Sequence, residues 1–269
     1  MNDDAPRAAP HDPYAPAQIA RMVEEGGVRK AALPALQTLV LGALGGAFIA
    51  FGAMAYTVVV TGSPFGFGPT RLLGGVAFSL GLILCLVGGA ELFTGNALLA
   101  MAWAGRRVTL ARLLRNWALV YVANAAGAFA TAGLAHAAGI ATLGDGAVGA
   151  TAAAIADDKL GLGTGEALFR GVLCNVLVCL AVWLSLAARD VAGKVLAIVF
   201  PIAAFVALGF EHSVANMFTI PFGELAAGRS PGLTALLVNL VPVTIGNVIG
   251  GGGLVALVYW LAYPRPAAR

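Results

Sequence analysis

The sequence predicts an all-α membrane protein, with six transmembrane helices arranged as an inverted repeat of three plus three. Three observations predict this fold class: the composition, the number of long apolar runs, and a pattern of polar residues that occurs twice. The chain is 59% hydrophobic and only 11% charged, whereas an average soluble domain carries about 25% charged residues. The composition therefore places the chain among polytopic membrane proteins.

Six apolar runs supply the roughly 20 residues that a spanning helix needs. They cover residues 35–60, 72–103, 117–138, 172–188, 195–222 and 233–263. The second and fifth runs are long and contain polar residues near the middle. We therefore predict that transmembrane helices two and five are broken.

The spans define the domain organisation. Residues 1–30 form an N-terminal segment, in which residues 17–32 are predicted to be a short amphipathic helix at the membrane surface. Residues 31–264 form the six-helix domain, with repeats at about 31–140 and 165–264, and residues 265–269 form a short tail.

Lysine and arginine predict the orientation. Twelve of them lie in the two terminal segments and in the loops after even-numbered spans, against four on the opposite side. Basic residues are enriched on the cytoplasmic side of a membrane. Both termini are therefore expected in the cytoplasm. Since the basic residues lie at span ends and form no patch, no nucleic-acid partner is expected.

Polar residues recur in the same order in the two halves of the chain. Span two contains "ELFTGN", from Glu91 to Asn96, and span five contains "EHSVAN", from Glu211 to Asn216. The next span of each half carries two asparagines eight residues apart, and these are Asn116 and Asn124, then Asn239 and Asn247. An odd number of spans per half places the halves in opposite orientations, which is an inverted repeat.

The repeat predicts a site near the bilayer midplane, where spans two and five meet. Non-helical backbone at that depth is tolerated only if it is buried in protein or lines a cavity. Broken helix ends point backbone N–H groups at the cavity, which favours an anionic permeant. The alternative interpretation is structural, with Glu91 and Glu211 hydrogen-bonded to neighbouring amides. For His212 we favour a functional role, since histidine exchanges protons near neutral pH.

Four motifs resemble the formate/nitrite transporter family. They are "GGAELFTGN" (88–96), "KL" (159–160), "RGVLCNVLVCLAVW" (170–183) and "GFEHSVANM" (209–217). The resemblance runs from about Tyr14 through the sixth span. It implies an aquaporin-like protomer with helices two and five broken, and a homopentamer in the bacterial cytoplasmic (inner) membrane with a pore in each protomer. The implied permeants are small monovalent anions or their conjugate acids.

The resemblance also implies roles for individual residues. His212 matches the family's central pore histidine, and Thr94 matches the threonine that faces it. Phe78 and Phe205 match the external constriction. The cytoplasmic constriction falls at Leu92 and Phe93, with Leu82 as a further candidate. The polar support and vestibule residues implied are Lys159, Asn175, Glu211, Asn216 and Glu91.

The chemistry expected from these residues is pH-dependent passage of formate, channel-like or proton-coupled. A bare charge is expensive in a dry constriction, and phenylalanine rings cannot replace the lost hydration. Lys159 is expected to concentrate anions in the vestibule. His212 would then hydrogen-bond the anion and share or donate a proton, because the neutral acid crosses an apolar barrier more cheaply. Glu211 and Asn216 would orient the histidine.

Several alternatives remain at this stage. Nitrite and then hydrosulfide are the next candidate permeants, since both are small monovalent anions. A water or glycerol channel is a different class, but no Asn-Pro-Ala motif occurs. An enzyme is not expected, because His11, His136 and His212 lack metal-ligand spacing and no cysteine pair suggests a metal site. We therefore expect no cofactor and no metal, with protons and membrane lipid as the remaining partners.

Overall fold

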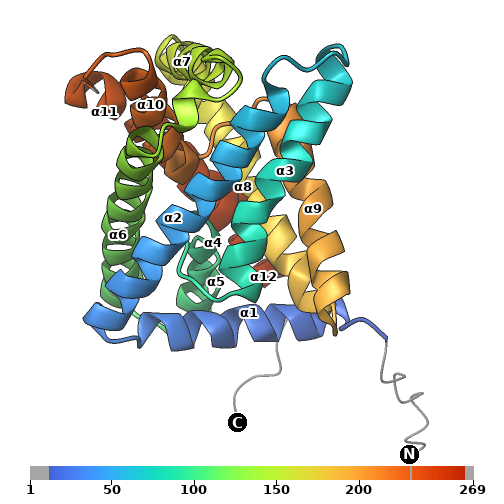
Figure 1. The fold of residues 1–269 in the computed structure, drawn as a ribbon. Coiled ribbons are helices and arrows are strands. Elements are labelled where there is room, and N and C mark those ends of the chain that lie inside the picture. Colours follow the sequence, from blue (N-terminus) through green and yellow to red (C-terminus); the bar gives the residue numbers. More distant parts are fainter. Residues whose placement is uncertain (1–11, 231, 264–269) are drawn as a thin grey trace, which may run out of the picture.

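The computed structural model describes residues 12–230 and 232–263, and it is helical throughout, with no strand among these residues. Figure 1 shows a bundle of long helices with one helix, α1 (Pro16–Ala31), lying across its lower end. Residue 264, the predicted tail at 265–269 and the start of the N-terminal segment lie outside the described residues.

Five helices are long and apolar enough to cross a membrane. Four of them are α2 (Ala35–Val60), α3 (Phe67–Val87), α6 (Leu110–Ala137) and α8 (Thr164–Ala187). The fifth is composite and consists of α11 (Leu233–Val248), the π-helix η2 (Ile249–Leu257) and α12 (Val258–Ala262). A shorter apolar helix, α9 (Val191–Ala207), lies between α8 and α11 in the sequence.

The second and fifth apolar runs each divide into shorter helices at corresponding positions. In the second run α3 ends at Val87, residues 88–92 are not helical, and α4 (Phe93–Asn96) and α5 (Leu99–Ala104) follow. In the fifth run α9 ends at Ala207, residues 208–212 are not helical, and α10 (Ser213–Ala226) follows. The two five-residue interruptions match the repeat in the sequence.

Residues 139–163, between the third and fourth apolar runs, contain two further helices. The short 3-10 helix η1 (Ile140–Thr142) leads to α7 (Ala147–Leu160), whose 14 residues are too few to span a bilayer. Hydropathy did not predict this helix. In Figure 1, α7 lies at the opposite end of the bundle from α1.

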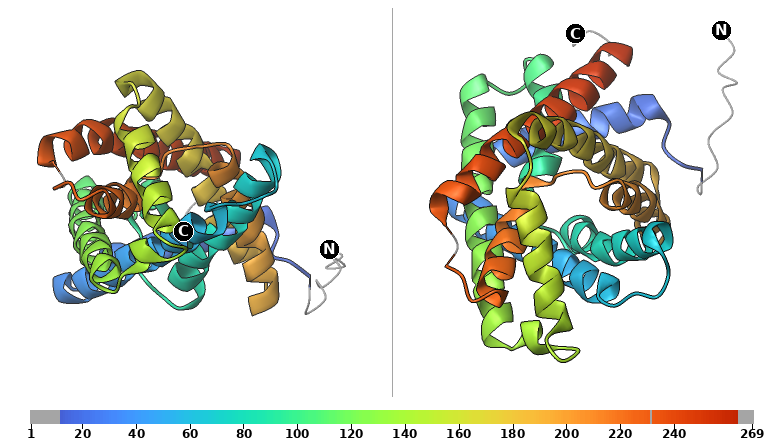
Figure 2. Two further views of the ribbon diagram at one scale, coloured as in Figure 1. Left: turned by 45° about the horizontal axis from the view of Figure 1, so that its top comes forward. Right: turned by 90° about the horizontal axis from the view of Figure 1, so that it is seen from above.

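The two halves of the chain pack in the same way. In the first half α2 packs against both α3 and α6, and in the second half α8 packs against both α9 and α11. The halves meet where α3 packs against α9 and where α10 packs against α6. Figure 2 shows this arrangement along the bundle, with the helices of both halves enclosing a common centre.

Glycines allow the closest of these helix contacts. A Cβ at Gly46 of α2 would overlap the backbone of Asn124, and a Cβ at Gly127 of α6 would overlap the carbonyl oxygen of Ala43. In the second half, Gly250 lies equally close to the carbonyl oxygen of Val172. Small residues at such positions let membrane helices approach until their backbones touch. Many of the 36 glycines in the sequence therefore contribute to helix packing.

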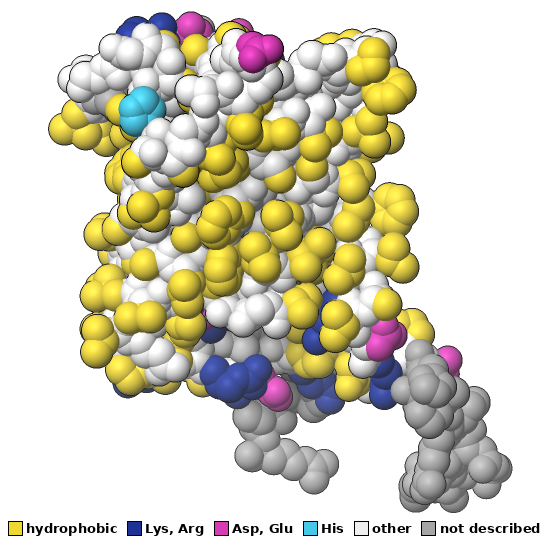
Figure 3. Space-filling view, in the orientation of Figure 1, with side chains coloured by type: hydrophobic (Ala, Val, Ile, Leu, Met, Phe, Trp, Pro, Cys, Tyr) yellow, Lys and Arg dark blue, Asp and Glu magenta, His cyan; other side chains and the backbone are white. Residues whose placement is uncertain are grey.

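The surface is that of a membrane protein. Figure 3 shows hydrophobic side chains over the middle of one face, with lysine and arginine near its lower and upper edges. Large apolar side chains are widely exposed, for example Val122 at 63%, Leu134 at 70% and Phe200 at 72%. A soluble monomer rarely exposes contiguous apolar surface on this scale.

The predicted amphipathic helix at residues 17–32 corresponds to α1. Its buried side is mostly apolar, with Ile19, Ala20 and Val23, and also includes Glu24. The helix packs mainly against α5. Because α1 closes one end of the bundle, its last residues reach the polar groups that follow α3. That contact places Lys30 in the candidate site.

Candidate functional site

Two cavities enter the bundle from opposite ends. The cavity beside α7, here called the α7 cavity, has a volume of about 360 Å³, and its lining includes Phe78, Lys159, Phe205 and His212. The cavity above α1, here called the α1 cavity, has a volume of about 220 Å³, and its lining includes Lys30, Leu82, Leu92 and Asn96.

A hydrogen bond between Thr94 and His212 joins the two halves of the protein. The Thr94 hydroxyl lies 2.9 Å from His212 Nε2, and both residues are buried. Thr94 belongs to α4, just after the first interruption, and His212 ends the second interruption. The repeat thus brings together two residues that are 118 positions apart.

The backbone fixes the protonation pattern of the His212 ring. The Ala215 amide donates to His212 Nδ1 at 3.0 Å, so that the imidazole is the N-cap of α10. A nitrogen that accepts a hydrogen bond carries no hydrogen, so the neutral ring has its hydrogen on Nε2. His212 therefore presents an N–H donor toward Thr94.

Two phenylalanines lie beside the histidine. The rings of Phe78 and Phe205 meet edge to face with centroids 5.5 Å apart. Phe205 also stacks on the His212 ring, with centroids 6.0 Å apart and planes at 17°. Both phenylalanines line the α7 cavity although they are only 6% and 3% exposed. The pair thus places an apolar layer next to the histidine.

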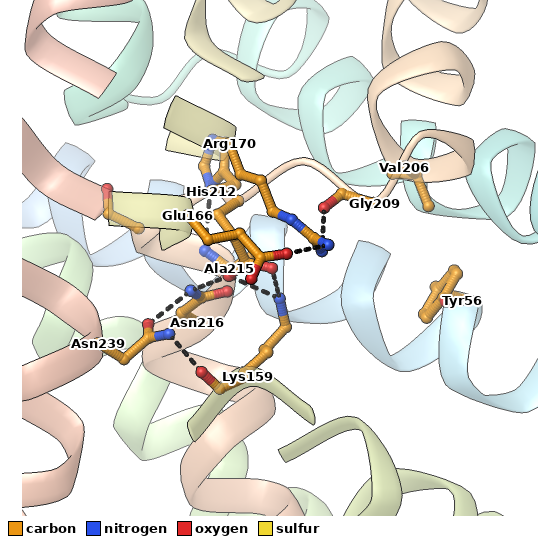
Figure 4. Close-up of polar contacts among 12 residues, drawn as sticks. Tyr56, Lys159, Glu166, Arg170, Val206, Gly209, His212, Ala215, Asn216 and Asn239 are labelled. Atoms are coloured by element: carbon orange, nitrogen blue, oxygen red, sulfur yellow. Dashed lines mark hydrogen bonds and ion pairs between the residues drawn. The ribbon is translucent and has the colours of Figure 1, made fainter. Parts of the chain in front are cut away.

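A polar network surrounds the second interruption. The Lys159 ammonium contacts both carboxylate oxygens of Glu211, at 2.9 and 3.0 Å. The Asn216 amide donates to Glu211 at 2.6 Å and to Asn239 at 2.8 Å, and Asn239 donates to the Lys159 carbonyl. Figure 4 shows Lys159, Asn216 and Asn239 joined in this way below His212. The charge of Lys159 is therefore already balanced by Glu211.

The first interruption has a matching network. The Asn96 amide donates to Glu91 at 2.6 Å and to Asn116 at 2.9 Å. Asn116 donates to the Lys30 carbonyl, and the Lys30 ammonium lies 2.9 Å from Glu91. Lys30 occupies the place that Lys159 has in the other half. Sequence reasoning missed Lys30 because it lies in α1, outside the two aligned spans of its repeat.

A second asparagine holds each interruption in place. Asn124 accepts from the Phe93 amide at 2.9 Å and donates to the Glu91 and Gly42 carbonyls. Asn247 accepts from the Ser213 amide at 2.9 Å and donates to the Glu211 and Gly171 carbonyls. The bonds to the Phe93 and Ser213 amides and to the Glu91 and Glu211 carbonyls satisfy backbone groups at the interruptions, which is necessary wherever such groups are buried away from water. The polar pattern in the sequence is thus a repeated hydrogen-bonding pattern.

The remaining sequence-predicted residues divide into two groups. Leu82 and Leu92 line the α1 cavity. Phe93 lines neither cavity and packs edge to face against Tyr121, with centroids 4.9 Å apart. Asn175 also lines neither, and its amide donates to the Thr94 carbonyl at 3.1 Å. Asn175 therefore supports the backbone of Thr94.

The groups at the site provide hydrogen-bond donors, acceptors and charge. Within the described residues, no three histidine, cysteine or acidic side chains converge as metal ligands would. The three cysteines are buried and free. What the site offers is one imidazole N–H, one hydroxyl and two lysine–glutamate pairs, arranged along the line between two cavities.

The fold and this site define a membrane transport protein, and the chain belongs to the formate/nitrite transporter family. The profile of that family, described as "Formate/nitrite transporter", matches residues 17–261. The "Formate channel FocA" of Escherichia coli K12 is 41% identical over 275 residues, which cover 95% of this chain and 96% of that protein.

Solved structures show the same fold. A "Pentameric formate channel with formate bound" superimposes with a TM-score of 0.78 at 38% identity, covering 85% of this chain and 97% of the other. An "FNT family ion channel" superimposes with a TM-score of 0.84 at 28% identity, covering 92% of this chain and 99% of the other. The family resemblance found in the sequence motifs is therefore confirmed.

Proposed function

We propose that this protein conducts formate across the bacterial cytoplasmic membrane, as a homopentamer with one pore per protomer. The observation that carries the proposal is the Thr94–His212 pair, 2.9 Å apart, in which His212 lines the α7 cavity and Thr94 precedes Gly95, which lines the α1 cavity. Likeness to proteins described as formate channels supports formate as the permeant. Likeness to a pentameric one supports the assembly.

The proposed membrane architecture is six spans in an inverted three-plus-three repeat. Spans two and five are interrupted at residues 88–92 and 208–212, and the matching helix bounds and asparagine contacts of the two halves support this assignment. In this architecture α1 and α12 lie at the cytoplasmic end, which agrees with the distribution of lysine and arginine in the sequence.

The proposed path runs from the α7 cavity, past Phe78, Phe205 and His212, to Leu92 and Leu82 at the α1 cavity. The apolar residues exclude water and limit the size of the solute. An anion loses hydration there, and that loss is costly unless hydrogen bonds replace it. The His212 Nε2–H and the Thr94 hydroxyl supply those bonds to a carboxylate, and the lysine–glutamate pairs mark the two ends of the path.

Proton coupling follows from the same geometry. Formate that gains a proton becomes a neutral acid, which crosses the apolar layer at lower cost than the anion. His212 can become a cation only by releasing the Ala215 amide from Nδ1, so in its resting state the ring is a neutral donor. Transport is therefore expected to increase as the pH falls and protons become available to the bound anion.

Nitrite is the second candidate permeant and hydrosulfide the third. Both carry one negative charge and are small enough for the same aromatic layer. Neither hydrogen bonding nor charge at His212 and Thr94 separates them from formate. The chain is proposed to move its solute without chemical conversion.

Uptake into proteoliposomes tests the proposal. Formate, nitrite and hydrosulfide are compared at two pH values, with wild-type protein and two variants of His212. His212→Asn keeps a side-chain acceptor for the Ala215 amide, since asparagine is a good N-cap, but it cannot titrate. His212→Phe removes both properties. Size-exclusion chromatography checks that each variant remains a pentamer.

The expected result is formate uptake by the wild type that rises at the lower pH, and loss of that pH dependence in both variants. His212→Asn should keep wild-type thermal stability better than His212→Phe. Wild-type vesicles that take up no formate would overturn the proposed permeant. Unchanged uptake and unchanged pH dependence in His212→Asn would remove the role of the histidine.

A further inference from the structure

Three cations line the α7 cavity, Arg71, Lys159 and Arg170, together with the carboxylates of Asp158 and Glu211. Lys159 is paired with Glu211 at 2.9 Å, and Arg170 is paired with Glu166 at 2.5 Å. Arg71 lines the same cavity, and no carboxylate of the described residues lies within ion-pairing distance of it. Among these three cations, Arg71 is therefore the one without a paired carboxylate, and its charge is available to an anion entering this cavity.

Backbone carbonyls hold the Arg71 guanidinium in a fixed position. Its Nη2 donates to the Val206 carbonyl at 2.9 Å and its Nε to the Ala207 carbonyl at 3.4 Å, while Nη1 donates to the Tyr56 hydroxyl at 3.1 Å. These carbonyls end α9, where the helix dipole is negative and favours a cation. A guanidinium has five N–H donors, so donors on both Nη atoms remain for a ligand.

Arg170 approaches the same point from α8. Its Nη1 donates to the Gly209 carbonyl at 3.1 Å, as Figure 4 shows, and its own carbonyl accepts from the Glu211 amide. Gly209 has a φ of +72°, and a Cβ placed there would lie 3.1 Å from Arg71 Nη2 and 3.6 Å from Arg170 Nη1. The absence of a side chain at Gly209 thus leaves a notch between two guanidinium groups.

We propose that Arg71 and Arg170 bind a small carboxylate in this notch before it moves to His212. The planar donor pairs of arginine match the two oxygens of a carboxylate, which a lysine ammonium does not. Arg71 supplies a charge that no carboxylate is paired with, and Arg170 adds donors whose charge Glu166 partly offsets. The inference rests on the proposed function, because it assigns the entry step of the same path.

In this proposal the entering anion is bound by the two arginines and not by Lys159. In the sequence interpretation Lys159 was expected to concentrate anions, but its ammonium is occupied by Glu211 and its side chain is only 17% exposed. The two arginines line the same cavity, and the Arg170 side chain is 39% exposed. Lys159 then serves to hold Glu211, and the arginine pair recruits the carboxylate.

Formate uptake by three variants tests the proposal. Initial rates are measured against formate concentration at low and high ionic strength, in vesicles where formate enters from the α7 side. Arg71→Gln keeps hydrogen-bond donors but removes the charge, whereas Arg71→Lys keeps the charge but not the planar donor pair. Arg229→Gln is the matched control, since Arg229 pairs with Glu224 and Asp157 and does not line the cavity. The hydrogen bond to Glu224 raises the pKa of Arg229, so this control residue stays charged at every pH used.

Arg71→Gln should raise the half-saturating formate concentration about threefold or more at low ionic strength, with little change in maximal rate. Arg71→Lys should recover part of that loss, Arg229→Gln should match the wild type, and high salt should reduce the difference between variants. An unchanged half-saturating concentration in Arg71→Gln would overturn the proposal. A second result would also overturn it: both Arg71→Gln and Arg71→Lys lose maximal rate and keep the half-saturating concentration. That result would indicate that Arg71 only caps α9.

A binding measurement separates this inference from the proposed function. Formate carries one C–H proton, so saturation-transfer NMR detects its binding to the detergent-solubilised pentamer without any transport. A signal in the wild type that decreases in Arg71→Gln but persists in Arg229→Gln supports the site even if uptake fails. Equal signals in all three proteins would overturn the site while leaving the proposed permeant standing.

Discussion

At the residue scale, the two buried carboxylates, Glu91 and Glu211, determine which substitutions the site tolerates. Glu211 is 4% exposed and Glu91 is 5% exposed, and each is held by a lysine and an asparagine. Breaking a buried ion pair by removing one partner leaves an uncompensated charge, which costs more than replacing both partners. The main role of Lys30 and Lys159 is therefore to stabilise the local fold around the two buried carboxylates.

Lys159→Met should accordingly destabilise the protein, by about 3 kcal/mol, because it leaves the Glu211 carboxylate buried without a counter-ion. The double variant Lys159→Met with Glu211→Gln should recover most of that stability. Thermal unfolding of the purified pentamer measures both. If the double variant is no more stable than Lys159→Met alone, the ion pair does not hold Glu211 in place.

Several of these residues could be predicted from the sequence, and others could not. Glu211, His212 and Thr94 stand out as polar residues within apolar runs, where such residues are expensive. Their contact at 2.9 Å follows from the repeat. Lys30 and Arg71 look like ordinary basic residues near span ends, and only the folded chain shows that α1 and the end of α9 place them at the two cavities.

At the element scale, helix contacts depend on glycine where two backbones meet. Gly127 of α6 lies against the Ala43 carbonyl of α2, whereas Gly133, six residues later in the same helix, has no neighbour within 4 Å of the position where a Cβ would be. The sequence contains 36 glycines but does not say which of them touch another helix. It also predicted no helix at residues 147–160, because α7 is too short to form a span.

Gly127 and Gly133, both on α6, allow the same substitution to be compared at a packed and an unpacked position. Gly127→Ala should separate α2 from α6 and destabilise the protein by about 1–3 kcal/mol, since the added methyl overlaps backbone that cannot move independently. Gly133→Ala should be neutral or slightly stabilising, because alanine favours the helix. Thermal unfolding in detergent compares them, and equal midpoints would contradict the close packing described for α6.

At the scale of the whole molecule, the two ends of the bundle carry matching polar networks. The end with α1 has Lys30, Glu91 and Asn96, and the end with α7 has Lys159, Glu211 and Asn216. The sequence predicted this symmetry from the spacing of asparagines. It did not predict the difference at its centre, where Leu92 of one half corresponds to His212 of the other.

The orientation of the molecule can be tested with single introduced cysteines. The native cysteines are buried, so they should not react with a membrane-impermeant maleimide. Asp145→Cys, near η1 and exposed, should be labelled in intact cells, whereas Arg112→Cys in the exposed first turn of α6 should be labelled only after lysis. The opposite labelling pattern would invert the proposed topology.

The glycine contacts between helices also bear on how fast a solute can pass. Helices whose backbones touch, as α3 of one half and α9 of the other do where Gly75 meets the Ala203 backbone, cannot slide past each other without losing that contact. A mechanism that rocks one half of the protein against the other would need such sliding, and it would be limited to the microsecond-to-millisecond times of domain motion. Rotation of Leu82, Leu92 or a phenylalanine ring needs no helix to move and is far faster. The framework therefore favours passage by side-chain displacement, at rates closer to those of a channel than of a carrier.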